Sequence, residues 1–159
     1  MGATVRVQGG LSMSQDRQLL DNIAARTREI VNAQTAVVAL AESEGEVVYY
    51  AAAVGKHAEL ILDRRGATAT SGLCGVAFRE HQPVLVCQTQ NDSRVRQDYV
   101  KALGIKTALA VPLHYERKLL GALMVLNRTD GSEFNEMAER ILADYAKEAA
   151  LLICQSQAT

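Results

Sequence analysis

The feature that most constrains the fold is the unbroken apolar run from Leu119 to Leu126, which follows the polar turn at 115–118 and precedes Asn127-Arg128. A short run of this kind, without a charged residue, predicts a strand that is buried on both faces. Such a strand takes a central place in its sheet, so other elements must cover it from both sides. The run is far too short to span a bilayer, and no membrane insertion is expected.

Four other short segments predict strands, because they are rich in small or branched apolar residues and are bounded by turn residues. They cover residues 34–41, 47–54, 84–87 and 106–113. A glycine-containing turn at 42–45 joins the first two into a hairpin. The turn at 115–118 joins the fourth to the central run in the same way. The chain therefore predicts a largely antiparallel sheet.

Apolar residues at three- and four-residue spacing predict two long amphipathic helices, at 14–32 and 135–155. Ser14 is the expected N-cap of the first. Shorter helices are expected at 57–63, at 73–80 after the Gly72–Gly75 pair, and at 96–103 with Gly104 as C-cap. The order of elements indicates an α+β fold in which the terminal helices lie together on one face of the sheet.

Length and composition bound the organisation of the chain. The 159 residues predict a disordered or linker lead-in at 1–13 and one domain at 14–157. Lysine and arginine number 17 against 18 acidic residues, so no basic surplus favours nucleic acid as a partner. Three cysteines without C-x-x-C spacing indicate a reducing cytoplasm. No metal-ligand spacing is present, and no metal or cofactor is expected.

Five segments in the right order resemble the GAF domain family over residues 15–155. They are Ser71-Gly-Leu-Cys-Gly-Val-Ala-Phe78, Pro83-Val-Leu-Val86, Ala108-Leu-Ala-Val-Pro-Leu113, Leu119-Leu-Gly-Ala-Leu-Met-Val-Leu-Asn-Arg128 and the closing helix. The resemblance implies a twisted antiparallel sheet of five or six strands, in which the five predicted strands take the order 2-1-5-4-3. It also implies terminal helices on one face and, on the other, a ligand cavity covered by short helices and the 88–106 loop.

Subfamilies of GAF domains differ in the ligand that they bind. Asn127-Arg128, Phe134 and Glu139 resemble, in order, the motif of the cyclic-nucleotide-binding members, but Ala138 stands at its first acidic position. The ion pair that locks that motif is therefore missing. Asn127 and Phe134 either recognise a ligand or only shape the corner between strand and helix.

Two other ligand classes are disfavoured by the residues present. Val95 and Arg96 stand where bilin-binding members carry a Cys-His pair, so no covalent bilin is expected. Haem-binding members use a pocket histidine. Here His57, His81 and His114 all fall near predicted turns, where solvent exposure is the expected environment.

One GAF subfamily is enzymatic, and Gly72-Leu73-Cys74-Gly75 resembles its G-V-C-G segment. In these free methionine-R-sulfoxide reductases a helix N-terminus would lower the pKa of such a thiol. The 88–106 loop has no catalytic cysteine, and Cys87 is the nearest thiol that could resolve a sulfenic acid. Packing, redox sensing and catalysis all remain open for Cys74.

The sequence indicates a cytoplasmic sensory or regulatory domain of a signal-transduction protein, such as a two-component system. It would bind a small molecule, form a homodimer through the terminal helices, or do both. The alternative is a thiol-based redox sensor or a reductase-like enzyme that uses Cys74.

The predicted ligand site combines apolar lining with nearby polar side chains. The expected lining residues are Cys74, Phe78, Tyr99, Leu109 and Val111. The polar candidates for fixing a ligand are Asp92, Arg94, Arg96 and Asp98. For the two aromatic residues the alternative role is ordinary core, and for the four charged residues it is a solvated surface.

Overall fold

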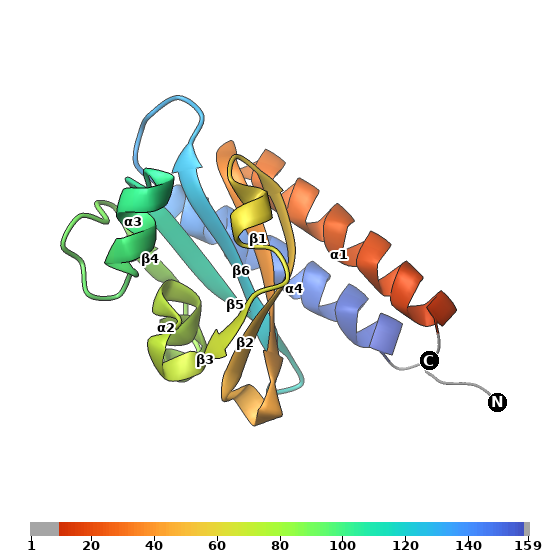
Figure 1. Ribbon diagram of the computed structural model, residues 1–159. Helices are drawn as coiled ribbons and strands as arrows, with labels where there is room; N and C mark the ends of the chain where they lie inside the picture. The colour runs from red at the N-terminus through yellow and green to blue at the C-terminus, as the bar shows by residue number, and fades with distance from the viewer. Residues whose placement is uncertain (1–9, 158–159) are drawn as a thin grey trace.

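A six-stranded antiparallel sheet forms the middle layer of the protein, with strand order β3-β2-β1-β6-β5-β4 (Figure 1). The computed structural model describes residues 10–157. The strands are β1 (Ala33–Glu42), β2 (Val47–Gly55), β3 (Arg65–Ala67), β4 (Val84–Val86), β5 (Ala108–Tyr115) and β6 (Lys118–Arg128). The predicted order of the five strands is confirmed, and β3 adds a short edge strand that the sequence analysis did not predict.

Strand β6 occupies the centre of the sheet, as its apolar run predicts. It pairs with β1 on one side and with β5 on the other. Its side chains alternate between two separate clusters of buried residues: Leu123 and Val125 belong to one, and Ala122, Met124 and Leu126 to the other. Both faces of the sheet are therefore buried, and each requires a covering layer of other elements.

The terminal helices α1 (Gly10–Ile30) and α4 (Glu136–Gln157) lie together on one face (Figure 1). Their apolar sides pack on the sheet through fully buried residues such as Ile23 and Leu142. Helix α1 begins at Gly10, so the prediction of Ser14 as N-cap is wrong; residues 11–13 contain no helix breaker. Residues 1–9 of the predicted lead-in lie outside the described residues. Within residues 10–157, no helix is both long and apolar enough to cross a membrane.

The opposite face carries the short elements. They are the 3-10 turns η2 (Ala58–Leu60) and η3 (Thr68–Thr70) and the helices α2 (Gly72–Glu80) and α3 (Gln97–Leu103). Helix α2 packs on β5 and β6. A Cβ on Gly75 would lie 2.1 Å from the carbonyl oxygen of Thr68, so only glycine allows α2 to approach η3 this closely.

The corner after β6 is organised by Asn127 and Phe134. The Asn127 side chain accepts hydrogen bonds from the backbone N–H groups of Lys106 and Thr107, at 2.7 and 3.3 Å, and donates one to the carbonyl of Gly104 at 2.9 Å. Phe134 is fully buried, and its backbone N–H donates to the Thr107 hydroxyl. These contacts agree with the corner-shaping alternative for both residues.

Candidate functional site

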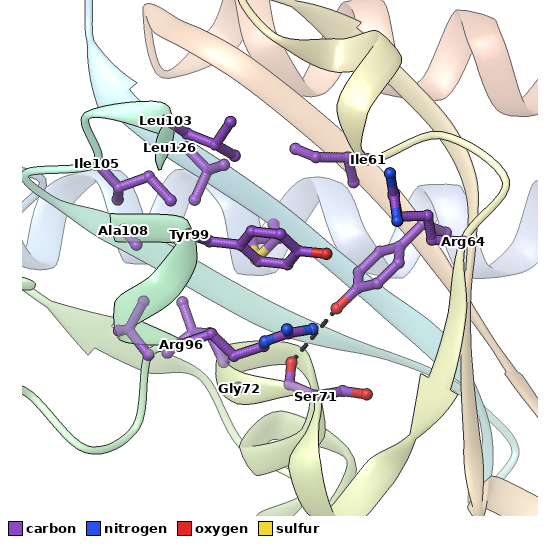
Figure 2. A pocket seen from close by; sticks show the side chains of 14 residues that line it. Ile61, Arg64, Ser71, Gly72, Arg96, Tyr99, Leu103, Ile105, Ala108 and Leu126 are labelled. Atoms are coloured by element: carbon purple, nitrogen blue, oxygen red, sulfur yellow. Dashed lines mark hydrogen bonds between the residues drawn. The ribbon is translucent and has the colours of Figure 1, made fainter. Parts of the chain in front are cut away.

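A small cavity lies between the sheet and the segments that carry α2, α3 and residues 61–64 (Figure 2). Its floor is apolar and is formed by Val95, Leu103, Ile105, Ala108, Met124 and Leu126. Its volume is about 40 Å³. An apolar protein cavity of roughly 150 Å³ binds benzene, so this smaller space suits a short apolar group. A larger ligand must extend through the mouth or displace the covering segments.

Polar groups gather at the mouth of the cavity. Tyr50 is 9% exposed, and its hydroxyl donates a hydrogen bond to the carbonyl of Ser71 at 3.3 Å. Burial raises the pKa of Tyr50, so its hydroxyl keeps its proton. Figure 2 shows the Tyr99 hydroxyl and the Arg96 guanidinium facing the same space, with Arg64 across from them. The site is thus an apolar pit with a hydrogen-bonding rim.

Arg96 is held at the rim by the way in which α3 begins. Its own backbone is extended, it directly precedes α3, and its carbonyl accepts the N–H of Val100. Its guanidinium binds the Asp98 carboxylate through Nε and Nη2, at 3.3 and 2.7 Å, and stacks 4.2 Å from the centre of the Tyr99 ring. The hydrogen bond from Arg96 lowers the pKa of Asp98, which keeps this pair charged.

Two of the predicted polar residues lie away from the cavity. Asp92 and Arg94 form their own ion pair at 2.7 Å in the loop before α3, and neither lines the cavity. The hydrogen bond from Arg94 lowers the pKa of Asp92. Of the four charged residues predicted to fix a ligand, Arg96 alone is part of the cavity wall. Asp98 adjoins it from the solvent side, with its side chain 62% exposed.

Cys74 and Phe78 lie on the predicted face of the sheet but not at the cavity surface. Cys74 is fully buried, with its Sγ 3.7 Å from the Sδ of Met124, so it lies one layer behind the cavity wall. Phe78 is 3% exposed and lies further along α2, beside Leu119 and His81 at a separate groove. Both residues therefore serve as core under α2.

The predicted positions of Leu109 and Val111 are wrong. Both side chains belong to the cluster under the terminal helices, whereas Ala108 and Ala110 face the cavity side. Successive residues of a strand point to opposite faces of the sheet. An assignment that is wrong by one residue therefore places every chosen side chain on the wrong face. The small alanines leave room for the short helices to approach the sheet.

The sequence prediction missed several residues of the wall, among them Tyr50, Ile61, Arg64 and Met124. The alternation along β6 could have indicated Met124, because it shares a face with Ala122 and Leu126. Tyr50 and residues 61–64 meet through long-range backbone hydrogen bonds, from Tyr50 to Arg64 and from Asp63 to Tyr50. No local pattern indicates that contact.

The histidines lie apart from the cavity. His81 Nδ1 and His114 Nε2 are 3.0 Å apart at the end of α2 and β5, and burial lowers the pKa of His114. None of the residues that line the cavity is a histidine. Among residues 10–157, no three histidine, cysteine or acidic side chains gather into a metal site.

Burial makes Cys74 a protonated thiol. Its pKa is raised from 9.0 to about 12, because a buried thiolate would lose its hydration. This is the opposite of the lowered pKa that a helix N-terminus alone predicts. Above pH 9 the unfolded chain releases this proton while the folded chain retains it, so the contribution of Cys74 to stability decreases as pH rises through this range.

We expect thiol reagents to distinguish Cys74 from Cys87 in the folded protein. Cys87 is exposed and Cys74 is fully buried, so iodoacetamide at pH 8 should alkylate Cys87 at least about a hundredfold faster. Peptide mass spectrometry at timed intervals measures both rates. In urea the two rates should converge, which controls for intrinsic reactivity. Rapid alkylation of Cys74 in the folded state would show that α2 opens readily.

The fold defines a class of protein: small domains in which long terminal helices cover one face of an antiparallel sheet and a lid of short helices covers the other. The sequence pattern of the GAF domain matches residues 17–153, and the chain belongs to this family. GAF domains are typical of signalling and sensory proteins and commonly bind small molecules.

Solved structures share this fold at low sequence identity. The GAF domain/HD domain protein of Geobacter sulfurreducens has a TM-score of 0.78 at 18% identity, over 97% of this chain and 100% of that one. The second GAF domain of DevS from Mycobacterium smegmatis has a TM-score of 0.73 at 17% identity, over 90% and 96%. The type II free methionine-R-sulfoxide reductase of Thermoplasma acidophilum has a TM-score of 0.71 at 16% identity, over 91% of this chain and 96% of that one. No curated protein matches the chain.

Proposed function

We propose that this GAF domain is the cytoplasmic sensor of a signal-transduction protein, such as a two-component system, and that it binds a small molecule in the cavity under α2 and α3. The observation that carries the proposal is the cavity itself, an apolar pit with two tyrosine hydroxyls and two guanidiniums at its mouth. Pockets that bind small molecules combine an apolar lining with a few convergent polar groups in this way.

A chain of contacts links the cavity rim to the terminal helices. Arg64 lines the mouth, and the preceding residue, Asp63, accepts a hydrogen bond from the Tyr49 hydroxyl at 3.0 Å. Arg17 of α1 reaches the same carboxylate at 3.4 Å. This exposed pair adds little to stability. The Arg17–Asp63 contact nevertheless connects residues 61–64 directly with α1. A ligand that shifts residues 61–64 would therefore bias the position of α1.

The test of ligand binding is native mass spectrometry of the freshly purified domain, followed by an NMR screen of small fragments. A ligand should appear as an adduct that is lost on denaturation, and fragments should shift the amide signals of Ile105, Ala108 and Leu126. Ala108→Val, which fills the cavity, should remove these shifts. Ala110→Val lies on the same face outside the cavity wall and is the matched control. If the native mass shows no adduct and no fragment shifts the amide signals, the proposal is rejected.

A second element of the proposal is a homodimer through α4. Four large apolar side chains on this helix remain exposed within the chain: Met137, Ile141, Leu151 and Leu152. An isologous contact between two copies would bury them. Sedimentation at micromolar concentration should show a dimer, and Ile141→Glu should dissociate it. Lys101→Glu on α3, on the other side of the sheet, should leave it intact; a monomeric parent protein would rule the dimer out.

The alternative function is thiol chemistry at Cys74. The Gly72-Leu-Cys-Gly75 segment and the fold shared with the sulfoxide reductase favour it. Full burial and a raised pKa oppose it in this conformation. Incubation with methionine sulfoxide and dithiothreitol tests it directly. Turnover no greater than that of Cys74→Ser would exclude the reductase-like enzyme.

A further inference from the structure

We propose that the cavity selects a small monocarboxylate with a tail of one or two carbon atoms, an inference that rests on the proposed small-molecule function. The tail would occupy the apolar floor, and the carboxylate would bind at the rim beside Arg96. Three observations support this choice: the charge of the rim, the unused donor of Arg96, and the size of the apolar space.

The rim carries a net positive charge. Arg64 and Arg96 line the cavity, and no aspartate or glutamate is among the lining residues. Asp98 neutralises Arg96 from outside. Arg64 donates from Nε to the carbonyl of Leu60 at 2.6 Å and has no carboxylate partner within the described part of the chain. Arg64 therefore adds an uncompensated positive charge to the rim, which favours an anionic ligand over a cation.

Arg96 offers a donor that the fold does not use. Asp98 occupies Nε and Nη2, and the Tyr99 ring supports one face of the guanidinium. Nη1 has no acceptor among residues 10–157. Arg96 lines the same cavity as Tyr50 and Ser71, and Figure 2 shows its guanidinium at the mouth. A carboxylate oxygen placed there could accept a charge-assisted hydrogen bond, about twice as strong as a neutral one.

The size of the cavity limits the rest of the ligand. A volume of about 40 Å³ is well below the roughly 150 Å³ of an apolar protein cavity that binds benzene, so the space favours a short aliphatic tail over an aromatic ring. The floor offers only apolar side chains, among them Leu103, Ile105 and Met124. A hydroxylated tail would leave its polar groups without partners there, which is unfavourable. Propionate fits both requirements and serves as the probe.

The experiment compares propionate with propionamide, which has nearly the same shape and no charge. Both are titrated into the ¹⁵N-labelled full chain at constant ionic strength, with the amide signals of Ile105, Ala108 and Leu126 as reporters. Propionate should bind at least about tenfold more tightly, the effect of one charge-assisted hydrogen bond. Arg96→Met should abolish this preference, and Arg96→Lys should retain part of it.

Arg94→Met is the matched control, because Arg94 forms an equivalent pair with Asp92 but lies outside the cavity wall. It should leave the preference for propionate unchanged. Equal binding of the two probes, or equal losses in the Arg94 and Arg96 variants, would overturn the carboxylate inference while the small-molecule proposal stands. If neither these probes nor any other fragment shifts the reporter signals, both fail.

Discussion

Replacing Gly121 with alanine is expected to lower the free energy of unfolding by roughly 3 kcal/mol or more. Gly121 lies within β6, opposite Leu40 of β1. A Cβ at this position would lie 1.9 Å from the carbonyl oxygen of Ala39 and 3.0 Å from the Cα of Leu40. Both obstacles are backbone atoms of the neighbouring strand. They cannot move without breaking the ladder of hydrogen bonds at the centre of the sheet.

Urea denaturation monitored by circular dichroism measures the loss. Gly131→Ala is the control, since Gly131 has φ +82° and no atom within 4 Å of an added Cβ. It should cost only about 1 kcal/mol, from backbone strain alone. Equal losses in the two variants would show that the close approach of β1 and β6 does not require glycine at 121.

Replacing Leu109 with alanine should lower stability by about 2–5 kcal/mol without changing the cavity. Leu109 is fully buried and packs under the terminal helices, on the face of β5 opposite the cavity. The substitution leaves a void between the sheet and the helices. Urea denaturation measures the loss, and Leu60→Ala, at a side chain that is 43% exposed, should be nearly neutral.

The affinity for fragments that bind in the cavity should be unchanged in folded Leu109→Ala. The same NMR titration that tests the proposed function measures it. If Leu109→Ala kept its stability but lost fragment binding, the result would indicate that Leu109 lines the cavity. This outcome would contradict the placement of β5 side chains described above.

The sheet could be predicted from sequence because its signals are local. The apolar run at 119–126 indicated a central strand, and turn residues marked the hairpins. The faces of β5 could not be predicted in the same way. Its Ala-Leu-Ala-Val sequence is apolar on both faces, so alternation does not say which set meets which layer. Large side chains were assigned to the ligand, but they pack against the long helices, and the alanines accommodate the short ones.

The candidate site was predictable only where its residues lie within the covering loop. Arg96 and Tyr99 were found because they flank the start of a short helix in that loop. Tyr50 and Arg64 were missed, because their meeting depends on a backbone hydrogen bond between β2 and the segment before β3. The pKa of Cys74 was misjudged for a similar reason. A helix start is visible in sequence, whereas the depth of burial follows from the packing of α2 on the sheet.

The pairing of β1 with β6 has a consequence for the rate of folding. These two strands form the centre of the sheet, yet every segment that covers the cavity, from η2 to α3, lies between them in the chain. Closing so long a loop is slow, since the loss of chain entropy precedes the contacts that compensate for it. The β1–β2 hairpin can form early on its own. The pairing of β1 with β6 can form only after the segments from η2 to α3 have been synthesised and packed on one face of the sheet.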